Sequence, residues 1–522
     1  MSHRINPILP LTLHQWNLYN VLDVHNLDAK FKRSKGGRPN PSVLTLLFGS
    51  VQNTGTFKTL SYFSVENMPA HFYTVNEANL NFITIGTVIV WVSPVTSKLL
   101  SDDPDVNPLA APITTIQLSF VGSLPQVGMV VGTLVFERVL NKFGRKICLN
   151  IFTVLLICGL VGLSFSKIIV VYYIFTFLNG MFLSAVLVGV PVYLSEITED
   201  HNRAQLSCYM GLFMPIGNLF GFIMGPIFSV KVFTLLTAFP SILSLIIFIF
   251  ILPESPVYLI TKNNRPAAEL ALNKFLEQDS LRVNKVADKI EFNLSQITKT
   301  KKANIAVIFT DRATRNGFIA ACVLMILTAT CGLPSFMSYL QPIFDATGTE
   351  VSGSIYAIIV GVVQVVLYFI ASLLVEKWGR RPLLLFSSIA STIPLVVLGA
   401  YFHLQSIGSS FVHHITWLPV VGIIVLVVTA VIGLCSVALA YLNDVFTSNI
   451  KATAISLIYF VSGFFTAGSV FLFPIIQEQI GLAWSFWMFS IFSGLGFVFI
   501  YYRVPETKGK NILEIQEILS KY

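Results

Sequence analysis

One short basic turn occurs twice in the sequence, and this duplication limits what the chain can fold into. Val139–Lys146 reads V-L-N-K-F-G-R-K and Val375–Arg381 reads V-E-K-W-G-R-R, each between two long apolar runs. Glycine allows a tight reversal between two helices, and the cations after it are rejected by hydrocarbon, so both turns belong on one water-exposed face. The repeat therefore predicts two related halves of a membrane protein, an organisation typical of transporters.

Charged residues recur in the same order after each copy of the turn. Y-L-S-E at Tyr193–Glu196 precedes Arg203, and Y-L-N-D at Tyr441–Asp444 precedes Lys451. A proline-glutamate pair follows in each half, with Glu254 in the first and Glu506 in the second. We predict an inner salt-bridge network of charges at helix ends: Arg145, Lys146, Glu196, Arg203, Glu254, Glu376, Arg380, Arg381, Asp444, Lys451 and Glu506.

This network has two interpretations. Glu196 with Arg203, and Asp444 with Lys451, can form a latch that closes the inner side in an outward-facing state and breaks in an inward-facing one. Single pairs at a water interface contribute about 0 to 1 kcal/mol, so only a network could bias such an equilibrium. Alternatively, the charges only anchor helix ends among the lipid headgroups.

Composition places the chain in the bilayer. Of 522 residues, 54% are hydrophobic and only 11% are charged, which is far from soluble averages. The formal charge of +8 lies in loops between apolar runs and forms no basic domain, so we predict no nucleic-acid partner. The six cysteines show no C-x-x-C spacing and are interpreted as small hydrophobes.

Twelve apolar segments are long enough to span a bilayer. We predict spans at Leu80–Leu100, Ile116–Phe136, Ile147–Phe165, Ile168–Leu194, Leu206–Phe228, Val232–Leu252, Gly317–Leu340, Ser354–Val375, Leu383–His403, Trp417–Leu442, Thr453–Ile476 and Leu482–Tyr502. The expected fold class is an all-α membrane protein with two six-helix pseudo-repeats. The first span is unusual, because the residues just before it are polar.

The spans divide the chain into an N-terminal tail (1–79), a six-helix bundle (80–260), a linker with short helices (261–315), a second bundle (316–503) and a C-terminal tail (504–522). With both termini inside, all of the 34 Lys and Arg residues except Lys98, Lys167 and Lys231 face the cytoplasm. The positive-inside rule therefore favours cytoplasmic termini and a cytoplasmic linker.

From about Leu80 onward the sequence resembles the sugar porter family of the major facilitator superfamily. Within that family it is similar to facilitated trehalose and glucose transporters. The matching motifs are N-K-F-G-R-K, E-K-W-G-R-R-P, P-V-Y-L-S-E-I with Arg203, P-E-S-P-V-Y-L and P-E-T-K-G-K-N-I-L-E-I. The resemblance implies two six-helix bundles, a central substrate site and alternating access.

The substrate positions implied by the resemblance are depleted of polar residues. The family's Q-Q-x-S-G-x-N pattern in helix seven reads T-A-T-C-G-L-P from Thr328, its glutamine in helix five falls at Gly211, and its G-P-x-P-W in helix ten reads C-S-V-A-L from Cys435. A polyhydroxylated solute needs inward amides and hydroxyls. Our candidates are Gln364, at the family's sugar-contacting asparagine, and Asn218, Gln126, Thr328 and Tyr339, the last resembling a gating tyrosine. Each could instead form only interhelical hydrogen bonds.

Two positions implied by the resemblance indicate whether transport is coupled to protons, and other motifs indicate whether the chain binds a metal or catalyses a reaction. Proton-driven sugar porters pair an acid in helix one with an arginine in helix four, whereas this chain has Val88 and Thr176 there, which disfavours proton symport. His403, His413 and His414 lack a metal spacing on a helix, so we expect neither a metal nor a cofactor. No P-loop or nucleophile elbow is present, which argues against an enzyme.

We therefore predict a passive sugar porter of the plasma membrane, with a hexose, a disaccharide such as trehalose or a less polar solute as its substrate. Its expected partners are this solute and the lipid bilayer, and no pattern indicates an oligomeric state. Depletion of the sugar site leaves a second hypothesis open, in which a homologue that no longer transports acts as a sensor or interaction protein.

Overall fold

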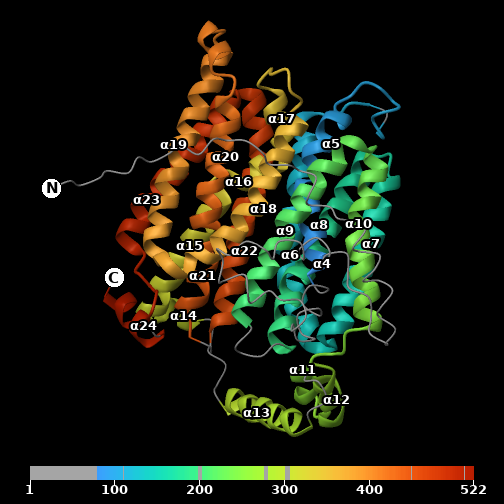
Figure 1. Cartoon of the computed structure of the whole chain (residues 1–522), viewed down its shortest axis with the longest axis vertical. Coiled ribbons are helices and arrows are strands. Elements are labelled where there is room, and N and C mark those ends of the chain that lie inside the picture. Colours follow the sequence, from blue (N-terminus) through green and yellow to red (C-terminus); the bar gives the residue numbers. More distant parts are fainter. Residues whose placement is uncertain are drawn as a thin grey trace, which may run out of the picture. The chain divides into compact units, whose positions relative to one another are not determined.

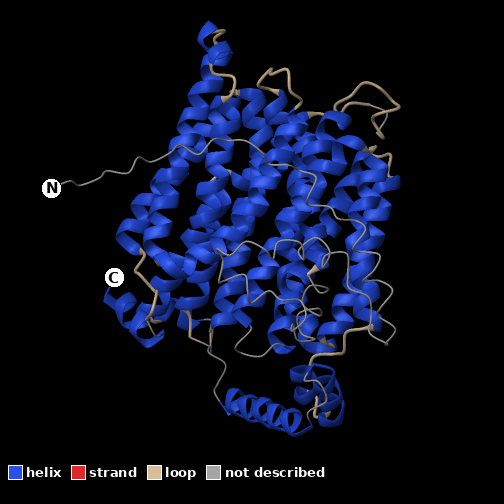
Figure 2. Cartoon of the chain, in the orientation of Figure 1, coloured by secondary structure: helices blue, strands red, loops and turns tan. Residues whose placement is uncertain are grey.

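The structure is a computed structural model, and it describes residues 79–109, 111–197, 203–275, 280–299, 306–447, 450–510 and 512–521. All of these lie in one compact unit, Pro69–Tyr522. In the described residues the regular secondary structure is entirely helical, as Figure 2 shows. The all-α class predicted from the apolar runs is confirmed.

Eleven described helical segments are long and apolar enough to cross a membrane. In chain order the spanning elements are α4 (Leu80–Val90) with α5 (Val92–Leu99), α6 (Thr115–Phe143), α7 (Arg145–Phe165), α8 (Ile169–Ile197), α10 (Val230–Phe250), α15 (Arg312–Thr330) with α16 (Leu333–Ser338), α18 (Gly353–Trp378), α19 (Arg380–Ser406), α20 (Leu418–Ala430) through η6 (Val431–Cys435) to α21 (Ser436–Val445), α22 (Lys451–Gln479) and α23 (Leu482–Arg503). A twelfth, α9 (Arg203–Ile227), has a shorter apolar part at Gly211–Ile227. Each predicted span therefore falls on a helix.

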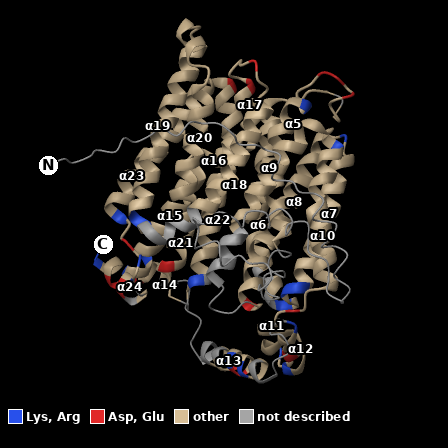
Figure 3. Ribbon diagram, viewed as in Figure 1, with Lys and Arg blue, Asp and Glu red and all other residues tan. Residues whose placement is uncertain are grey.

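The helices form two groups, which we name the N-half (α4 to α10) and the C-half (α15 to α23). Figure 1 shows the N-half in blue and green beside the C-half in yellow to red. The connecting segment carries α11 (Pro256–Thr261), α12 (Arg265–Phe275), α13 (Ser280–Lys299) and α14 (Ala306–Thr310). We name this side of the bundle the linker end and the opposite side the far end. Most described cations lie at the linker end, as Figure 3 shows.

Glycines bring particular helix pairs of the N-half into backbone contact. A Cβ atom at Gly128 would lie 2.1 Å from the Phe177 carbonyl oxygen, and one at Gly180 would lie 2.0 Å from the Pro125 carbonyl oxygen, so α6 and α8 tolerate no side chain there. The same holds for α4 and α9 at Gly86, where the Cβ would lie 2.1 Å from the Met214 carbonyl oxygen. Small residues that allow such close approach are how helices associate where lipid supplies no hydrophobic driving force.

Three spans are irregular. The first breaks at Trp91 between α4 and α5, because Pro94 has no N–H to bond the carbonyl four residues earlier. The seventh breaks after α15, where Gly332 adopts a left-handed conformation with φ 89°. The tenth contains the π segment η6, where the backbone N–H of Leu434 donates to Ser387 Oγ of α19 at 3.0 Å. Interrupted membrane helices commonly line functional cavities.

The linker and the C-terminal segment have their own packing. α12 and α13 lie in the linker for which short helices were predicted, and they bury a small core of Ile260, Ala268, Leu272, Val283 and Ala287. The helix α24 (Ile512–Lys521) packs on α15 and α21 of the C-half. There Gln516 Nε2 donates to the Val445 carbonyl at 2.6 Å, and Asn316 Nδ2 donates to the Leu519 carbonyl at 2.9 Å.

Candidate functional site

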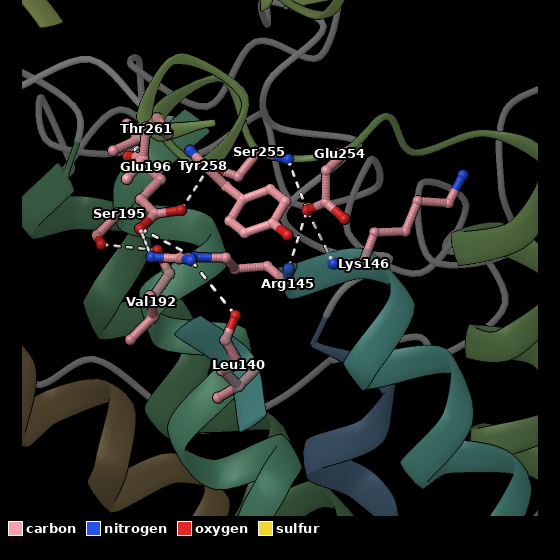
Figure 4. Close-up of polar contacts among 11 residues, drawn as sticks. Leu140, Arg145, Lys146, Val192, Ser195, Glu196, Glu254, Ser255, Tyr258 and Thr261 are labelled. Atoms are coloured by element: carbon pink, nitrogen blue, oxygen red, sulfur yellow. Dashed lines mark hydrogen bonds and ion pairs between the residues drawn. The ribbon is translucent and has the colours of Figure 1, made fainter. Parts of the chain in front are cut away.

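The first basic turn lies at the linker end of the N-half and holds a charged cluster, drawn in Figure 4. Gly144, with φ 102°, reverses the chain between α6 and α7 and places Arg145 at the first position of α7. Arg145 Nη2 contacts Glu196 Oε1 of α8 at 2.8 Å, and both side chains are largely buried, with exposed fractions of 12% and 13%. The guanidinium also lies 5.4 Å from the centre of the Tyr258 ring.

Glu254 supports this cluster through the backbone. Its Oε1 accepts the N–H groups of Arg145 and Lys146, both at 3.0 Å, and that of Ser255 at 2.9 Å. The carboxylate thus sits at the N-terminus of α7, where free N–H groups and the helix dipole favour an anion. Ser255 Oγ in turn donates to Glu196 Oε2. We name Arg145, Glu196, Glu254 and Ser255 the first turn cluster.

The C-half repeats this arrangement. After Gly379, with φ 89°, α19 begins at Arg380, whose Nε lies 3.3 Å from Asp444 Oδ2 of α21. Glu506 accepts the backbone N–H groups of Arg380 and Arg381, one on each carboxylate oxygen, both at 3.0 Å. Thr507 Oγ1 donates to Asp444 Oδ2 at 3.1 Å. Arg380, Asp444, Glu506 and Thr507 form the second turn cluster.

Burial alone would raise the pKa of Glu506. Hydrogen bonds from the backbone N–H groups of Lys508, Arg380, Arg381 and Thr507 outweigh burial and lower the pKa below its ordinary value. The second turn cluster is therefore built on a carboxylate that stays ionised at neutral pH.

The predicted network is brought together in part. Glu196 pairs with Arg145, and Asp444 pairs with Arg380; among the described residues no ion pair joins Asp444 to Lys451, seven positions later. Lys451 Nζ donates to the Asn443 carbonyl at 2.8 Å, and Lys146 Nζ donates to the Ile249 carbonyl at 3.1 Å. Arg381 Nη2 donates to the Tyr501 carbonyl at 2.7 Å. The side chains of Arg203 and Glu376 lie outside the described residues, so their predicted roles stay predictions.

Two of the predicted substrate residues contact each other across the halves. Asn218 Nδ2 of α9 donates to Gln364 Oε1 of α18 at 2.9 Å, and both side chains are buried, with 2% and 3% exposed. Helices α9 and α18 pack closely one turn away, where a Cβ at Gly361 would lie 3.1 Å from Leu219. Asn218 Oδ1 has no hydrogen-bond partner in the structure. This amide pair therefore joins the N-half to the C-half and keeps hydrogen-bonding capacity.

The other predicted substrate residues differ in setting. Tyr339 follows α16, is 2% exposed and has no hydrogen-bond partner for its hydroxyl, which points at Gly122 of α6 in the other half. Thr328 Oγ1 donates to the Met325 carbonyl of its own helix at 2.7 Å, and Gln126 is half-buried on α6.

Further contacts join the halves toward the far end, and sequence reasoning did not identify their residues. The backbone N–H of Gln341 donates to Ser93 Oγ of α5 at 2.9 Å, Ser338 Oγ donates to the Ile89 carbonyl at 3.4 Å, and the Phe120 and Phe471 rings lie 5.0 Å apart. Phe120 and Phe471 are ordinary apolar residues of membrane spans. No sequence pattern shows which face of each helix meets the other half.

The model of the family described as Sugar (and other) transporter matches residues 45–519. The chain belongs to this family. Its members are transporters, so this protein is a multi-pass membrane transporter and not an enzyme. The match begins at residue 45, inside the segment predicted as a tail, and residues 45–78 lie outside the described residues.

Relatives and solved structures agree with this assignment. Over 419 residues the chain is 29% identical to "Sugar transporter ERD6-like 6" of Arabidopsis thaliana, covering 78% of this chain and 83% of that protein. It is 27% identical over 449 residues to "Facilitated trehalose transporter Tret1" of Culex quinquefasciatus, covering 83% and 84%. The inward-open xylose transporter XylE of E. coli has a TM-score of 0.70 at 19% identity, covering 86% of this chain and 99% of XylE. The last similarity shows the major facilitator fold alone.

In this sugar-transporter family member the histidines at the far end lie apart from both turn clusters. His403 is near the end of α19, with its ring 5.5 Å from that of Trp487, while His413 and His414 lie in the short helix η5 (Ser410–His414). Among the described residues, no group of three His, Cys, Asp or Glu side chains is placed to hold a metal ion.

Proposed function

We propose that this protein carries a sugar, a hexose or a disaccharide such as trehalose, across its membrane by alternating access and passive facilitated diffusion. Family membership and the names of its relatives, a plant sugar transporter and an insect trehalose transporter, support this substrate class. The fold supports the mechanism, because two helix groups joined by a linker can rock about a site between them.

The observation that carries the proposal is the Asn218–Gln364 hydrogen bond. The two amides lie in different halves, and each offers a donor and an acceptor. A sugar hydroxyl also donates and accepts. It can therefore accept from Asn218 in place of Gln364, or donate to Gln364 in place of Asn218, so that neither bonded group is left unpaired. Asn218 and Gln364 thus hydrogen-bond to each other without solute, and they bind hydroxyl groups when solute enters. Thr328, Gln126 and Tyr339 are proposed as secondary positions.

Transport is proposed to be uncoupled from protons. Val88 and Thr176 occupy the places where proton-driven porters carry an acid and an arginine, and both side chains line one small cavity inside the N-half. Thr176 Oγ1 donates to the Tyr172 carbonyl of its own helix at 2.8 Å. A group that binds and releases a proton is therefore missing at this position.

The membrane and orientation are also proposals. We infer a plasma-membrane protein with the linker end in the cytoplasm, since the described Lys and Arg residues concentrate at that end (Figure 3). Residues 80–260 and 316–503 would be the two moving bodies, 261–315 the cytoplasmic connection, and 1–79 and 504–522 the cytoplasmic termini.

The test is uptake of a panel of labelled hexoses and disaccharides by cells that lack their own porters. We expect saturable uptake of at least one sugar that stops at the outside concentration. Accumulation above that concentration that collapses with a protonophore would show proton coupling instead. No uptake of any sugar, with the protein at the cell surface, would contradict the proposal.

The binding position has its own test. Asn218→Leu and Gln364→Leu should each raise the KM for the transported sugar by about tenfold or more, because each leaves a buried amide or sugar hydroxyl without a partner, at a cost of about 1–3 kcal/mol. Gln405→Leu is the matched control: Gln405 Nε2 donates to the Ala346 carbonyl at the far end, away from the amide pair. An unchanged KM in both amide variants would remove these residues from the site.

A further inference from the structure

A small cavity in the N-half is lined by residues of that half alone. It is formed by α4, α5, α6, α7 and α8, and it is lined by Val88, Trp91, Val92, Pro125, Leu160, Leu163, Thr176 and Asn179. The lining side chains are mostly apolar, and none of these residues is charged. Pro125 and Gly180 lie in backbone contact beside it, where α6 and α8 meet.

Asn179 is the polar residue in this lining that lacks a partner. Its side chain is 1% exposed, and neither Nδ2 nor Oδ1 has a hydrogen-bond partner in the structure. Gly159 of α7 leaves room for this amide, because a Cβ there would lie 2.1 Å from Asn179 Oδ1. Buried amides almost always have a partner, so this one indicates a bound molecule.

The chemistry of the cavity limits what that molecule is. It must donate to Oδ1 or accept from Nδ2, and Thr176, one turn earlier on α8, offers a hydroxyl oxygen that can accept, because its own hydrogen bonds the Tyr172 carbonyl. The cavity leaves about 10 Å³ for the centre of a water molecule, close to the smallest space that holds one water and far below what a sugar needs. An ion would lack a counter-charge among the lining residues.

We propose that Asn179 binds a single buried water molecule in this cavity, shared with Thr176. The water satisfies the amide and fills the space beside Pro125 of α6. Val88 and Thr176 line the same cavity, so this neutral hydrated site stands at the position where a coupled porter holds a buried charge pair. The site does not depend on the identity of the transported solute.

The direct test is a structure of the full chain at a resolution that shows ordered water. We expect one solvent peak within hydrogen-bond distance of the Asn179 amide, and its loss in Asn179→Leu. An empty cavity, or an Asn179 amide bonded to a protein group, would overturn the proposal.

Radiolytic hydroxyl-radical labelling provides a second test without high resolution, because a bound water generates radicals beside buried side chains. Leu160 lines the cavity, whereas Leu156, one turn earlier on α7 and equally buried, is outside the lining. We expect Leu160 to be modified several-fold more than Leu156 in the wild type, and the excess to disappear in Asn179→Leu. Equal labelling of the two leucines in the wild type, or an excess that persists in the variant, would show that Asn179 holds no water there.

Discussion

Glu254 and Glu506 make the same contact in the two halves of the protein. Each carboxylate accepts the first two backbone N–H groups of the helix that follows a basic turn, α7 for Glu254 and α19 for Glu506. The hydroxyl of the next residue, Ser255 or Thr507, donates to the acid of its own half, Glu196 at the end of α8 or Asp444 near the end of α21. The repeated sequence motif therefore forms the same arrangement of hydrogen bonds in each half.

The location of the two turn clusters matters for the transport cycle. In the described contacts, the first turn cluster links α7, α8 and the segment before α11, while the second links α19, α21 and the segment after α23. Each cluster thus lies inside one half. A movement of one half against the other can carry these described contacts intact, and the latch predicted with Arg203 and Lys451 stays a prediction.

The first prediction concerns the pH dependence of stability. Glu506 has a lowered pKa in the folded state, so the stability that it contributes is fully present above the ordinary Glu pKa of about 4.3 and is lost as the pH falls below it. Glu506→Gln should lower the melting temperature at neutral pH and show less further loss on acidification than the wild type. Thermal unfolding of the two proteins across this window checks it.

A control separates this effect from general charge loss. Glu517→Gln removes a carboxylate of α24 whose partner is Lys521, and both of these side chains are 70% exposed. It should leave the acid dependence unchanged, since exposed pairs contribute about 0 to 1 kcal/mol. Equal acid sensitivity of wild type and Glu506→Gln would show that the backbone hydrogen bonds do not stabilise the charged form.

Much of this arrangement follows from the sequence, and the limits have physical reasons. Hydrophobic run length fixes where α6 or α22 can cross a bilayer, and the glycine turns predict where the chain reverses. The partners of the charges were harder to predict: Glu254 binds backbone N–H groups, which no residue pattern displays. Asn218 and Gln364 were each singled out as polar residues in apolar spans, but their contact depends on the rotation of α9 and α18. The break at Trp91 had a signal, Pro94, whereas the π segment of the tenth span had none.

The second prediction separates two partners for Glu196. Glu196→Gln should destabilise the protein by about 1–3 kcal/mol, between the values for exposed and fully buried pairs, because Arg145 is left largely buried without its partner. Arg145→Gln should cost a similar amount, and the double variant less than the sum of the two. Thermal or denaturant unfolding measures this coupling.

The comparison for this cycle is Arg203, the partner suggested by the sequence repeat. Arg203→Gln combined with Glu196→Gln should be close to additive if Arg145 is the main partner. A larger coupling with Arg203 than with Arg145 would restore the pairing first predicted from the seven-residue spacing.

The third prediction concerns orientation. Ser295, exposed in α13 of the linker, is proposed to face the cytoplasm, and Ser410, exposed at the far end, is proposed to face outside. In a background without native cysteines, Ser410→Cys should react with an impermeant thiol reagent in intact cells and Ser295→Cys only after permeabilisation. Labelling of Ser295→Cys in intact cells would reverse the proposed topology.

The fourth prediction concerns closure of the far end. A Cβ at Gly122 would lie 2.2 Å from the Tyr339 hydroxyl oxygen and 3.0 Å from the ring carbon that carries it. Gly122→Ala should therefore keep Tyr339 from its position between the halves and shift the population toward a state open at the far end. Because the hydroxyl makes the closest contact, Tyr339→Phe added to Gly122→Ala should recover part of the closed population.

Tyr339→Phe alone shows whether the Tyr339 hydroxyl favours or opposes closure of the far end. In the closed state this hydroxyl is buried without a partner, and in an open state water can reach it, so closure costs about 1–3 kcal/mol that phenylalanine does not incur. Tyr339→Phe should therefore favour the closed far end, opposite to Gly122→Ala. Reactivity of a cysteine at Ser119, buried one turn from Gly122 on α6, reports the change: it should fall in Tyr339→Phe and rise in Gly122→Ala. A rise in both variants would mean that the Tyr339 hydroxyl has a partner when the far end is closed and helps to hold it shut.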